Sequence, residues 1–307
     1  MRLLNWVFII CLTSFIHCRI MQRISSIPKD SILETIQIDG IERKYIVYLP
    51  KTKIQTKEKI SLLLMLHGRF GSAKLMMEGY NLNAIADRER FAILYPDGFN
   101  RSWADGRGGT PADKNKIDDV KFLESIVKRI TVNYPINQNH IFITGHSNGG
   151  FMTQRMLIEK TNLFKAGISV TAHISKNVLM NSTPSNPISV AFISGTEDPL
   201  VPYEGGYVVD GEEVLGAEDS TRRWIEWNQC SKQPIVEKIN RQRDETSLEI
   251  YSYQECKENV RVRLYKLIGA GHMWPGLSQK IPFINLGKET KELNASEEIW
   301  NFFKLHL

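Results

Sequence analysis

The sequence has no stripe of basic residues and no cluster of histidines and cysteines. Its 39 lysines and arginines and its 34 acidic residues are scattered along the chain and leave a net charge of +5. A nucleic-acid-binding domain concentrates positive charge on one element, so we predict no nucleic-acid partner. The His and Cys spacing also lacks a zinc-like pattern, and we predict neither a metal nor an organic cofactor.

The apolar run at the amino terminus is too short for a comfortable membrane span, which needs about 20 residues. It covers residues 3–16 and follows Arg2, an arrangement typical of an export signal. We therefore predict a signal peptide over residues 1–18 and a secreted, periplasmic or cell-envelope protein. No A-x-A cleavage pattern follows the run. A lipid-modified Cys18, which would attach the protein to a membrane, and an uncleaved anchor are the alternatives.

Cysteine is scarce, with four in 307 residues. Cys11 and Cys18 lie in the predicted signal, which leaves Cys230 and Cys256 in the body of the protein. Two cysteines in an exported domain are a natural disulfide pair. We predict that they are bonded, with two buried free thiols as the alternative.

The chain contains no internal repeat, no low-complexity stretch and no long polar linker. Short apolar segments typical of buried strands alternate with segments of helical periodicity. The predicted strands cover residues 34–38, 44–49, 61–66, 91–95, 140–144, 166–170, 188–193 and 261–268, and the predicted helices cover 118–130, 148–159, 221–228 and 295–305. This alternation predicts an α/β fold with a mostly parallel sheet, helices on both faces and one domain over residues 27–307.

Two connecting segments carry turn signals. Asp39-Gly40 separates the first two predicted strands and suits a hairpin turn. Residues 99–117 are polar and include Gly106, Gly108 and Gly109, so we predict a long surface loop there.

Gly145-His146-Ser147-Asn148-Gly149 fits the pattern G-x-S-x-G between a predicted strand and a predicted helix. This is the context of the nucleophile elbow of α/β-hydrolases, where a tight turn exposes a serine hydroxyl above the sheet. The amides that open the following helix then point at a developing negative charge. We predict Ser147 as a nucleophile, with an ordinary serine in a glycine-rich turn as the alternative.

A serine hydroxyl needs a base to take its proton, and in this fold the acid and the histidine follow the nucleophile in that order. His146 adjoins Ser147 in the chain, so its side chain is expected to point elsewhere. His173 precedes the candidate acids, and His306 lies at the chain end. His272 lies in a glycine-containing loop after a predicted strand and is the predicted base.

Asp198 follows the strand predicted over residues 188–193, at the strand edge where this fold presents functional side chains. It is the predicted acid that orients the imidazole. Glu197 is its direct competitor, and Asp210 and Asp219 are weaker ones.

An oxyanion hole needs two backbone donors. The amide of Asn148 directly follows the nucleophile, and the Arg69 amide lies in the turn after the strand predicted over residues 61–66. We predict these two N–H groups. Trp274 is a candidate aromatic wall for an acyl group, with a buried structural tryptophan as the equal alternative.

Six segments, in order, resemble one known group, the secreted poly(3-hydroxybutyrate) depolymerase and feruloyl esterase family of α/β-hydrolases. They are LHGRFGSA (66–73), YPDGFNRSW (95–103), DDVKFL (118–123), GHSNGG (145–150), GTEDPLVPYEGG (195–206) and GAGHMWPG (269–276). The resemblance implies a catalytic triad of Ser147, Asp198 and His272 and favours Asp198 over Glu197. It also implies a disulfide between Cys230 and Cys256.

The chain departs from the family pattern at Arg69-Phe70, where members often have a cysteine and a glycine, and at Met273, where a smaller polar residue is common. Both changes bear on substrate preference. No appended substrate-binding domain is recognised in the sequence, which argues against efficient attack on a crystalline polymer.

We predict an exported serine esterase that hydrolyses small, oligomeric or polymeric carboxylic esters of short-chain, hydroxyalkanoate or feruloyl type through an acyl-enzyme. A polysaccharide deacetylase and a peptidase use the same triad and are alternatives. A surface-binding protein that has lost catalysis is the alternative from another class.

Overall fold

The computed structural model describes residues 31–51, 58–209, 213–242, 244–278 and 284–307. The predicted signal peptide, with Cys11 and Cys18, lies outside these residues, as does Asp210. No helix in the described part of the chain is long and apolar enough to cross a membrane.

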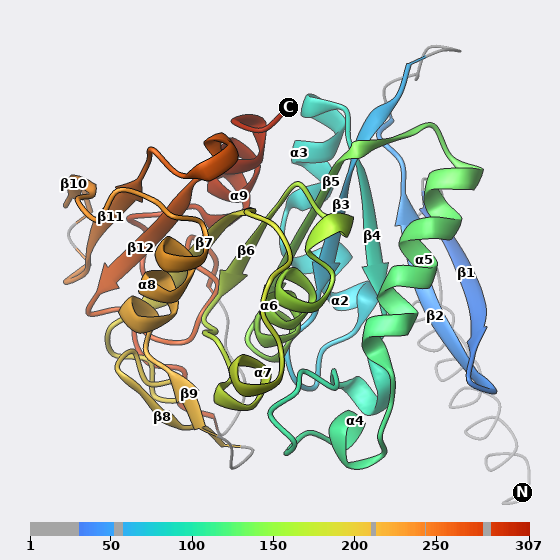
Figure 1. The fold of residues 1–307 in the computed structure, drawn as a ribbon, viewed down its shortest axis with the longest axis horizontal. Helices are drawn as coiled ribbons and strands as arrows, with labels where there is room; N and C mark the ends of the chain where they lie inside the picture. Colours follow the sequence, from blue (N-terminus) through green and yellow to red (C-terminus); the bar gives the residue numbers. More distant parts are fainter. Residues whose placement is uncertain (1–30, 52–57, 210–212, 243, 279–283) are drawn as a thin grey trace, which may run out of the picture.

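A ten-stranded sheet forms the centre of the molecule, in the order β1-β2-β4-β3-β5-β6-β7-β12-β11-β10 (Figure 1). Its parallel part consists of β4 (Ala92–Pro96), β3 (Ile60–Leu66), β5 (Ile136–His146), β6 (Ala166–Val170), β7 (Ser189–Gly195) and β12 (Val262–Ile268). Antiparallel strands flank it: β1 (Ser31–Ile38) and β2 (Ile41–Tyr48) at one edge, β11 (Ser247–Tyr253) and β10 (Ile235–Ile239) at the other.

The central strands follow from their apolar runs. Every residue of β3, β4, β6 and β7 is buried, as expected for strands covered on both faces. The predicted hairpin joins β1 to β2, and both of its turn residues, Asp39 and Gly40, have positive φ, 50° and 78°. Aspartate and glycine tolerate that conformation best.

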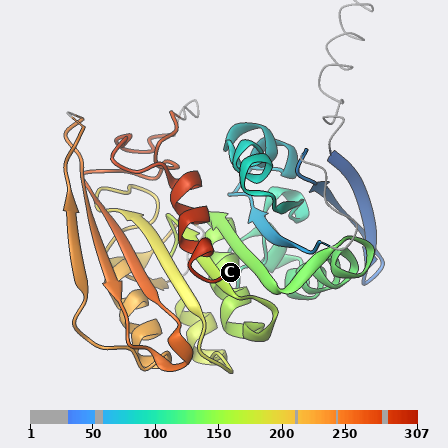
Figure 2. The ribbon, with the colours of Figure 1, turned by 90° about the horizontal axis from the view of Figure 1, so that it is seen from above.

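Helices cover both faces of the sheet, as Figure 2 shows from above. One layer contains α5 (Asp119–Asn133), α6 (Asn148–Glu159) and α8 (Ala217–Trp227), and the other contains α2 (Ala73–Gly79), α3 (Leu82–Glu89) and α9 (Ala295–Lys304). A separate buried apolar cluster lies under each layer. The predicted mostly parallel sheet with helices on both faces is confirmed. Asp118 caps α5, because its side chain accepts the Lys121 N–H.

Several elements were not predicted from the sequence. They are the helices α2 and α3, the short helices α4 (Pro111–Lys114) and α7 (Lys176–Asn181), strands β10 and β11, and a two-stranded sheet of β8 (Gly205–Tyr207) and β9 (Glu213–Leu215). Single 3₁₀ turns occur at Phe99–Arg101, Thr161–Leu163 and Lys257–Asn259.

The prediction of a surface loop over residues 99–117 is wrong for most of its middle. Trp103, Asp105 and Thr110 have no exposed surface. The loop is polar because its side chains replace water as partners of a buried backbone. Asp113, for example, accepts the N–H groups of Gly106, Gly108 and Thr110.

The sulfurs of Cys230 and Cys256 are bonded, which confirms the predicted disulfide. The bond joins the chain just after α8 to the chain just after β11. It therefore holds a helix of one layer against the antiparallel edge of the sheet.

Candidate active site

Ser147 lies at the tight turn between β5 and α6 and is a half-buried, non-glycine residue in a strained conformation, with φ 55° and ψ −119°. The flanking glycines allow the strand and the helix to approach. A Cβ on Gly145 would lie 2.2 Å from the Gly149 carbonyl oxygen, and one on Gly149 would lie 2.4 Å from the Leu66 oxygen. The G-x-S-x-G pattern is therefore what this packing requires.

Three predicted site residues meet at the carboxyl ends of parallel strands. Ser147 Oγ lies 2.8 Å from His272 Nε2, and His272 Nδ1 lies 2.7 Å from Asp198 Oδ2. The side chains of His272 and Asp198 are 5% and 2% exposed. A carboxylate accepts the Nδ1 proton, so Nε2 is left to accept a proton from the serine hydroxyl. We call these three residues the candidate triad.

Asp198 is held by backbone groups of its own loop after β7. Its Oδ1 accepts the N–H groups of Leu200 and Val201, both at 2.8 Å, so only Oδ2 faces the imidazole. The competitor Glu197 is exposed, and its backbone N–H donates to the Ala270 carbonyl oxygen. The carboxylate of Asp219, a weaker competitor, pairs with Arg222 and not with His272.

The loop after β12 that carries His272 is held by the segment 286–288. The His272 N–H donates to the Leu286 oxygen at 2.6 Å, and the Gly271 N–H donates to the Lys288 oxygen at 2.9 Å. A Cβ on Gly271 would lie 2.1 Å from the Leu286 oxygen, so this position excludes any larger residue.

His146 contacts the same loop from the other side. Its Nε2 lies 3.2 Å from the His272 carbonyl oxygen and its Nδ1 lies 3.3 Å from the Tyr80 hydroxyl. Burial lowers the pKa of His146 to about 3, with the neighbouring His272 acting in the same direction. A neutral ring donates from Nε2 and accepts the tyrosine proton at Nδ1. His146 thus supports the backbone of the candidate base, a role that no pattern in the sequence indicates.

The two predicted oxyanion donors belong to segments that adjoin Ser147. The Asn148 N–H opens α6 directly after the serine. The turn that contains Arg69 adjoins the elbow, because a Cβ on Gly68 would lie 3.4 Å from Ser147 Cβ. The Arg69 side chain points elsewhere, donating to the carbonyl oxygens of Asn100 and Arg101 at 3.4 and 3.2 Å.

His67 fixes this turn and was not assigned a role from the sequence. It is fully buried, its Nδ1–H donates to the Gly68 oxygen at 2.8 Å, and its Nε2 accepts the Gly98 N–H at 2.9 Å. Burial lowers the pKa of His67 to about 4. The neutral ring therefore joins the turn after β3 to the loop after β4.

His173, His306 and Trp274 have contacts outside the candidate triad. His173 Nε2 contacts Ser194 Oγ at 3.1 Å, and His306 Nδ1 lies 3.5 Å from Ser189 Oγ. Trp274 has no exposed surface, donates its indole N–H to Ser296 Oγ and packs edge-on against Tyr80. This placement favours the structural role for Trp274 over the substrate wall.

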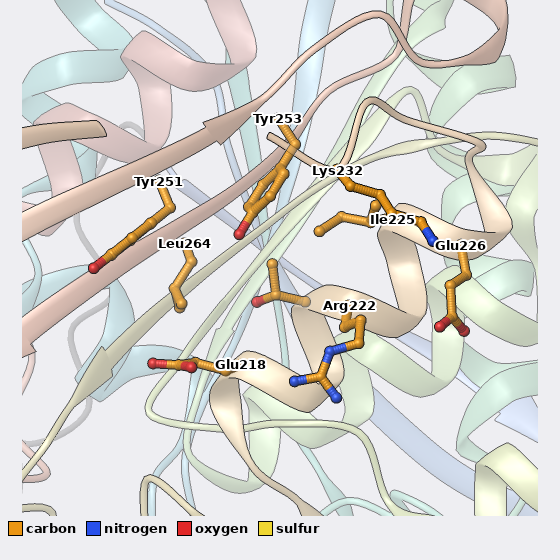
Figure 3. Close-up of a pocket in the computed structure, with 9 residues that line it drawn as sticks. Glu218, Arg222, Ile225, Glu226, Lys232, Tyr251, Tyr253 and Leu264 are labelled. Atoms are coloured by element: carbon orange, nitrogen blue, oxygen red, sulfur yellow. The ribbon is translucent and has the colours of Figure 1, made fainter. Parts of the chain in front are cut away.

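A cavity of about 320 Å³ lies between α8 and strands β11 and β12, away from the candidate triad (Figure 3). Tyr251, Tyr253 and Ile225 line it together with charged residues. Both of its carboxylates are already paired: Glu218 with Lys266, and Glu226 with Arg223.

Among the residues that the structure describes, no group of His, Cys, Asp and Glu is arranged to hold a metal ion.

The chain is similar to several known proteins. Residues 88–206, less than half of the chain, match the model of the prolyl oligopeptidase family. NocK of Nocardia uniformis subsp. tsuyamanensis, which carries an esterase assignment, is 28% identical over 283 residues, 87% of this chain and 80% of that protein. Feruloyl esterase B of Piromyces equi is 27% identical over 240 residues, 75% of this chain but only 42% of that protein.

The acetyl xylan esterase of Aspergillus awamori has the same fold. Its structure superposes with a TM-score of 0.58 at 11% identity and covers 89% of this chain and 99% of that one. The predicted α/β-hydrolase fold and the resemblance to feruloyl esterases are therefore confirmed. The hydroxybutyrate depolymerase side of that resemblance stays a prediction.

Proposed function

We propose that this chain, a carboxylic-ester hydrolase of the α/β-hydrolase type, is an exported serine esterase that works through Ser147, His272 and Asp198. One observation carries the proposal. A continuous line of hydrogen bonds of 2.8 and 2.7 Å runs from the strained elbow serine through the imidazole to a carboxylate that two further N–H groups hold in place. This is the arrangement that turns a weak hydroxyl into a nucleophile.

In the reaction, His272 Nε2 takes the proton of Ser147 while Oγ bonds to the ester carbonyl carbon. The carbonyl oxygen becomes an oxyanion and accepts the backbone N–H groups of Asn148 and Arg69. The C–O bond to the alcohol then breaks, and His272 returns the proton to the departing oxygen. Water repeats the sequence on the acyl-enzyme, releasing the acid and restoring Ser147. Asp198 stays ionised and stabilises the imidazolium in both halves.

The substrate class we propose is a feruloyl or acetyl ester of a polysaccharide, or a soluble fragment of one. Relatives and a fold neighbour with those activities support it. Export is supported by the short apolar run at residues 3–16 and by the Cys230–Cys256 disulfide, since disulfides persist outside the reducing cytosol. A lipid-modified Cys18 is the alternative form of this export, in which the protein stays attached to a membrane.

The test is hydrolysis by purified residues 27–307 of p-nitrophenyl acetate, methyl ferulate, acetylated xylan and hydroxybutyrate oligomers. Ser147→Ala is compared with Ser278→Ala, a control at an exposed serine. We expect the Ser147 variant to lose at least about 10³-fold in kcat, and the control to match wild type. Labelling by a fluorophosphonate should be lost in the Ser147→Ala variant and retained in the Ser278→Ala variant. Folded wild type without turnover or labelling would overturn the proposal.

A peptidase is the second candidate, because residues 88–206 match the prolyl oligopeptidase family. That match includes Ser147 and Asp198 but ends before His272. An amide with the same acyl group as the best ester separates the two. Efficient amide cleavage that depends on Ser147 would favour the peptidase, whereas ester turnover alone supports the esterase.

A further inference from the structure

Asn148 is 1% exposed, and both polar atoms of its side chain are hydrogen-bonded. Its Oδ1 accepts the Trp103 N–H at 2.8 Å, and its Nδ2 donates to the Trp103 oxygen at 3.2 Å and to Asp105 Oδ2 at 2.6 Å. The backbone N–H of the same residue is the oxyanion donor of the proposed function. These contacts therefore fix the first residue of α6 from a loop that lies far away in sequence.

Asp105 is itself anchored by a buried arginine. It has no exposed surface, and its Oδ2 accepts Nε and Nη2 of Arg107 at 3.0 and 2.8 Å. Arg107 is 4% exposed, and its guanidinium lies 4.1 Å from the centre of the Phe151 ring. Asn148 and Phe151 are one turn apart on α6, so the ion pair holds the start of that helix at two points.

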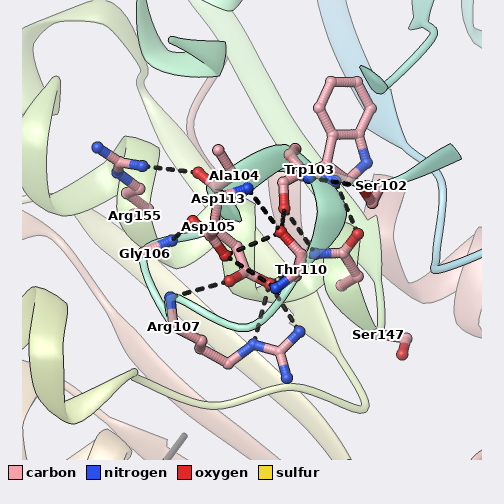
Figure 4. Close-up of polar contacts among 12 residues, drawn as sticks. Ser102, Trp103, Ala104, Asp105, Gly106, Arg107, Thr110, Asp113, Ser147 and Arg155 are labelled. Atoms are coloured by element: carbon pink, nitrogen blue, oxygen red, sulfur yellow. Dashed lines mark hydrogen bonds and ion pairs between the residues drawn. The ribbon is translucent and has the colours of Figure 1, made fainter. Parts of the chain in front are cut away.

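The loop also reaches the other predicted oxyanion donor. The indole N–H of Trp103 donates to the His67 carbonyl oxygen at 2.8 Å, directly before the turn of Gly68 and Arg69. Trp103 is thus bonded to Asn148 through its main chain and to the Arg69 turn through its side chain. Figure 4 shows this loop curled beside Ser147. Trp103 therefore links the two segments that carry the oxyanion donors.

Separate contacts keep the loop rigid. Thr110 Oγ1 donates to the Trp103 oxygen at 2.8 Å, and the Ala104 N–H donates to the buried Asp119 carboxylate at 2.7 Å. Arg155 donates to the Ala104 oxygen at 2.6 Å from the middle of α6 (Figure 4). A buried ion pair is weak evidence for stability, because desolvation opposes the attraction between the charges. Its place beside the nucleophile calls for another account.

We propose that Asp105 and the Asn148 side chain are positioning residues that hold the Asn148 backbone N–H in the geometry that the oxyanion needs. Trp103 joins this donor to the Arg69 donor. The inference rests on the proposed function. A donor that is misplaced by about 1 Å loses much of its effect on the transition state while the ester still binds. The network therefore acts on kcat and leaves KM largely unchanged.

Asn148→Ala is the main test, because it keeps the backbone N–H and removes the three side-chain bonds. We expect kcat on p-nitrophenyl acetate to fall about tenfold to hundredfold, with KM changed less than about threefold. Affinity for a trifluoromethyl ketone, which forms a tetrahedral adduct, should fall by the same factor as kcat. Trp103→Phe, which removes the indole N–H together with part of the buried ring but keeps the main-chain bonds to Asn148, should lower kcat by a smaller factor and serves if the alanine variant fails to fold.

The matched control is Gln154→Ala on the same helix. Gln154 is 1% exposed, donates to Ser169 Oγ and accepts the Trp224 indole N–H, both at 2.8 Å, but it lies about 9 Å further along α6. We expect it to lower the melting temperature and leave kcat unchanged. An equal loss of kcat in this control would mean that general destabilisation explains the effect and would overturn the inference.

A double-mutant cycle tests the route through Asp105. If Asp105 acts through Asn148, Asp105→Asn combined with Asn148→Ala should lose no more kcat than Asn148→Ala alone. Multiplying losses would refute that route. Wild-type kcat in the folded Asn148→Ala variant overturns this inference alone. A wild-type protein without Ser147-dependent turnover overturns the proposed function and this inference together.

Discussion

Replacing Asp198 by asparagine should reverse the tautomer of His272 without disturbing the fold. The Oδ1 atom of Asp198 accepts two backbone N–H groups at 2.8 Å. An asparagine at this position must place its oxygen there, since an NH₂ group cannot accept them. Its NH₂ group then faces His272 Nδ1, where Oδ2 lies at 2.7 Å in the native protein.

The consequence is large because Nδ1 must then accept a hydrogen bond. The imidazole proton moves to Nε2, which faces Ser147 at 2.8 Å and is no longer able to take the serine proton. The wrong tautomer in a triad of this kind lowers kcat about 10⁴-fold, equivalent to roughly 5 kcal/mol of transition-state stabilisation.

The assay is steady-state hydrolysis of the best ester at pH 7, with fluorophosphonate labelling as a measure of nucleophilicity. We expect kcat to fall about 10⁴-fold, labelling to slow in parallel, and the melting temperature to stay near that of wild type. Glu197→Gln is the control, because Glu197 is exposed and outside the triad. A loss smaller than about tenfold in the folded Asp198 variant would refute the tautomer argument.

Three further predictions concern stability, each measured by urea unfolding. Arg43→Met leaves the Asp119 carboxylate buried without the cation that lies 2.6 Å from it, so unfolding should be easier by about 3–5 kcal/mol. Burial raises the pKa of Asp119 and Arg43 opposes this, so the loss should shrink on acidification; equal losses at pH 4 and 7 would contradict it. Burial lowers the pKa of His67 to about 4, so the unfolded chain binds this proton more readily than the folded protein does. The stabilising contribution of neutral His67 to the free energy of unfolding is therefore complete above pH 6.5 and declines by about 3 kcal/mol as pH falls toward 4. A flat profile over that window would be the opposing result. Replacing Cys230 and Cys256 by serine opens a link across 26 residues and should remove about 3.5 kcal/mol; an unchanged midpoint would show that the bond contributes little.

The residues of the candidate triad could be named from the sequence because local sequence constrains them strongly. Ser147 stands in a pattern whose glycines the backbone approach requires. Asp198 and His272 follow apolar strands in the order that the fold dictates, and parallel strands bring their carboxyl ends to one edge of the sheet. The buried central strands were predictable for a similar reason, since covering on both faces leaves an uninterrupted apolar run.

Residues 99–117 show where sequence reasoning failed. Polar and glycine-rich composition is ordinarily typical of a solvated loop. Here the same composition serves a buried segment, because carboxylates such as Asp105, Asp113 and Asp119 accept backbone N–H groups of the loop. The antiparallel strand β10 was missed for a related reason. Most of its residues are exposed at the sheet edge, so its burial pattern carries little periodic signal.

The sequence by itself predicted the central strands and four of the helices in their chain order, the nucleophile elbow and the candidate triad. Those features depend on apolar periodicity and on backbone conformations that few residue types allow. Only the tertiary structure decided that Trp103 and Asp105 meet Asn148, that His146 and His67 are buried supports, and that Trp274 packs inside. Such contacts join residues tens of positions apart. Their partners are fixed by packing and by the need to satisfy buried polar groups, and neither leaves a pattern in one stretch of sequence.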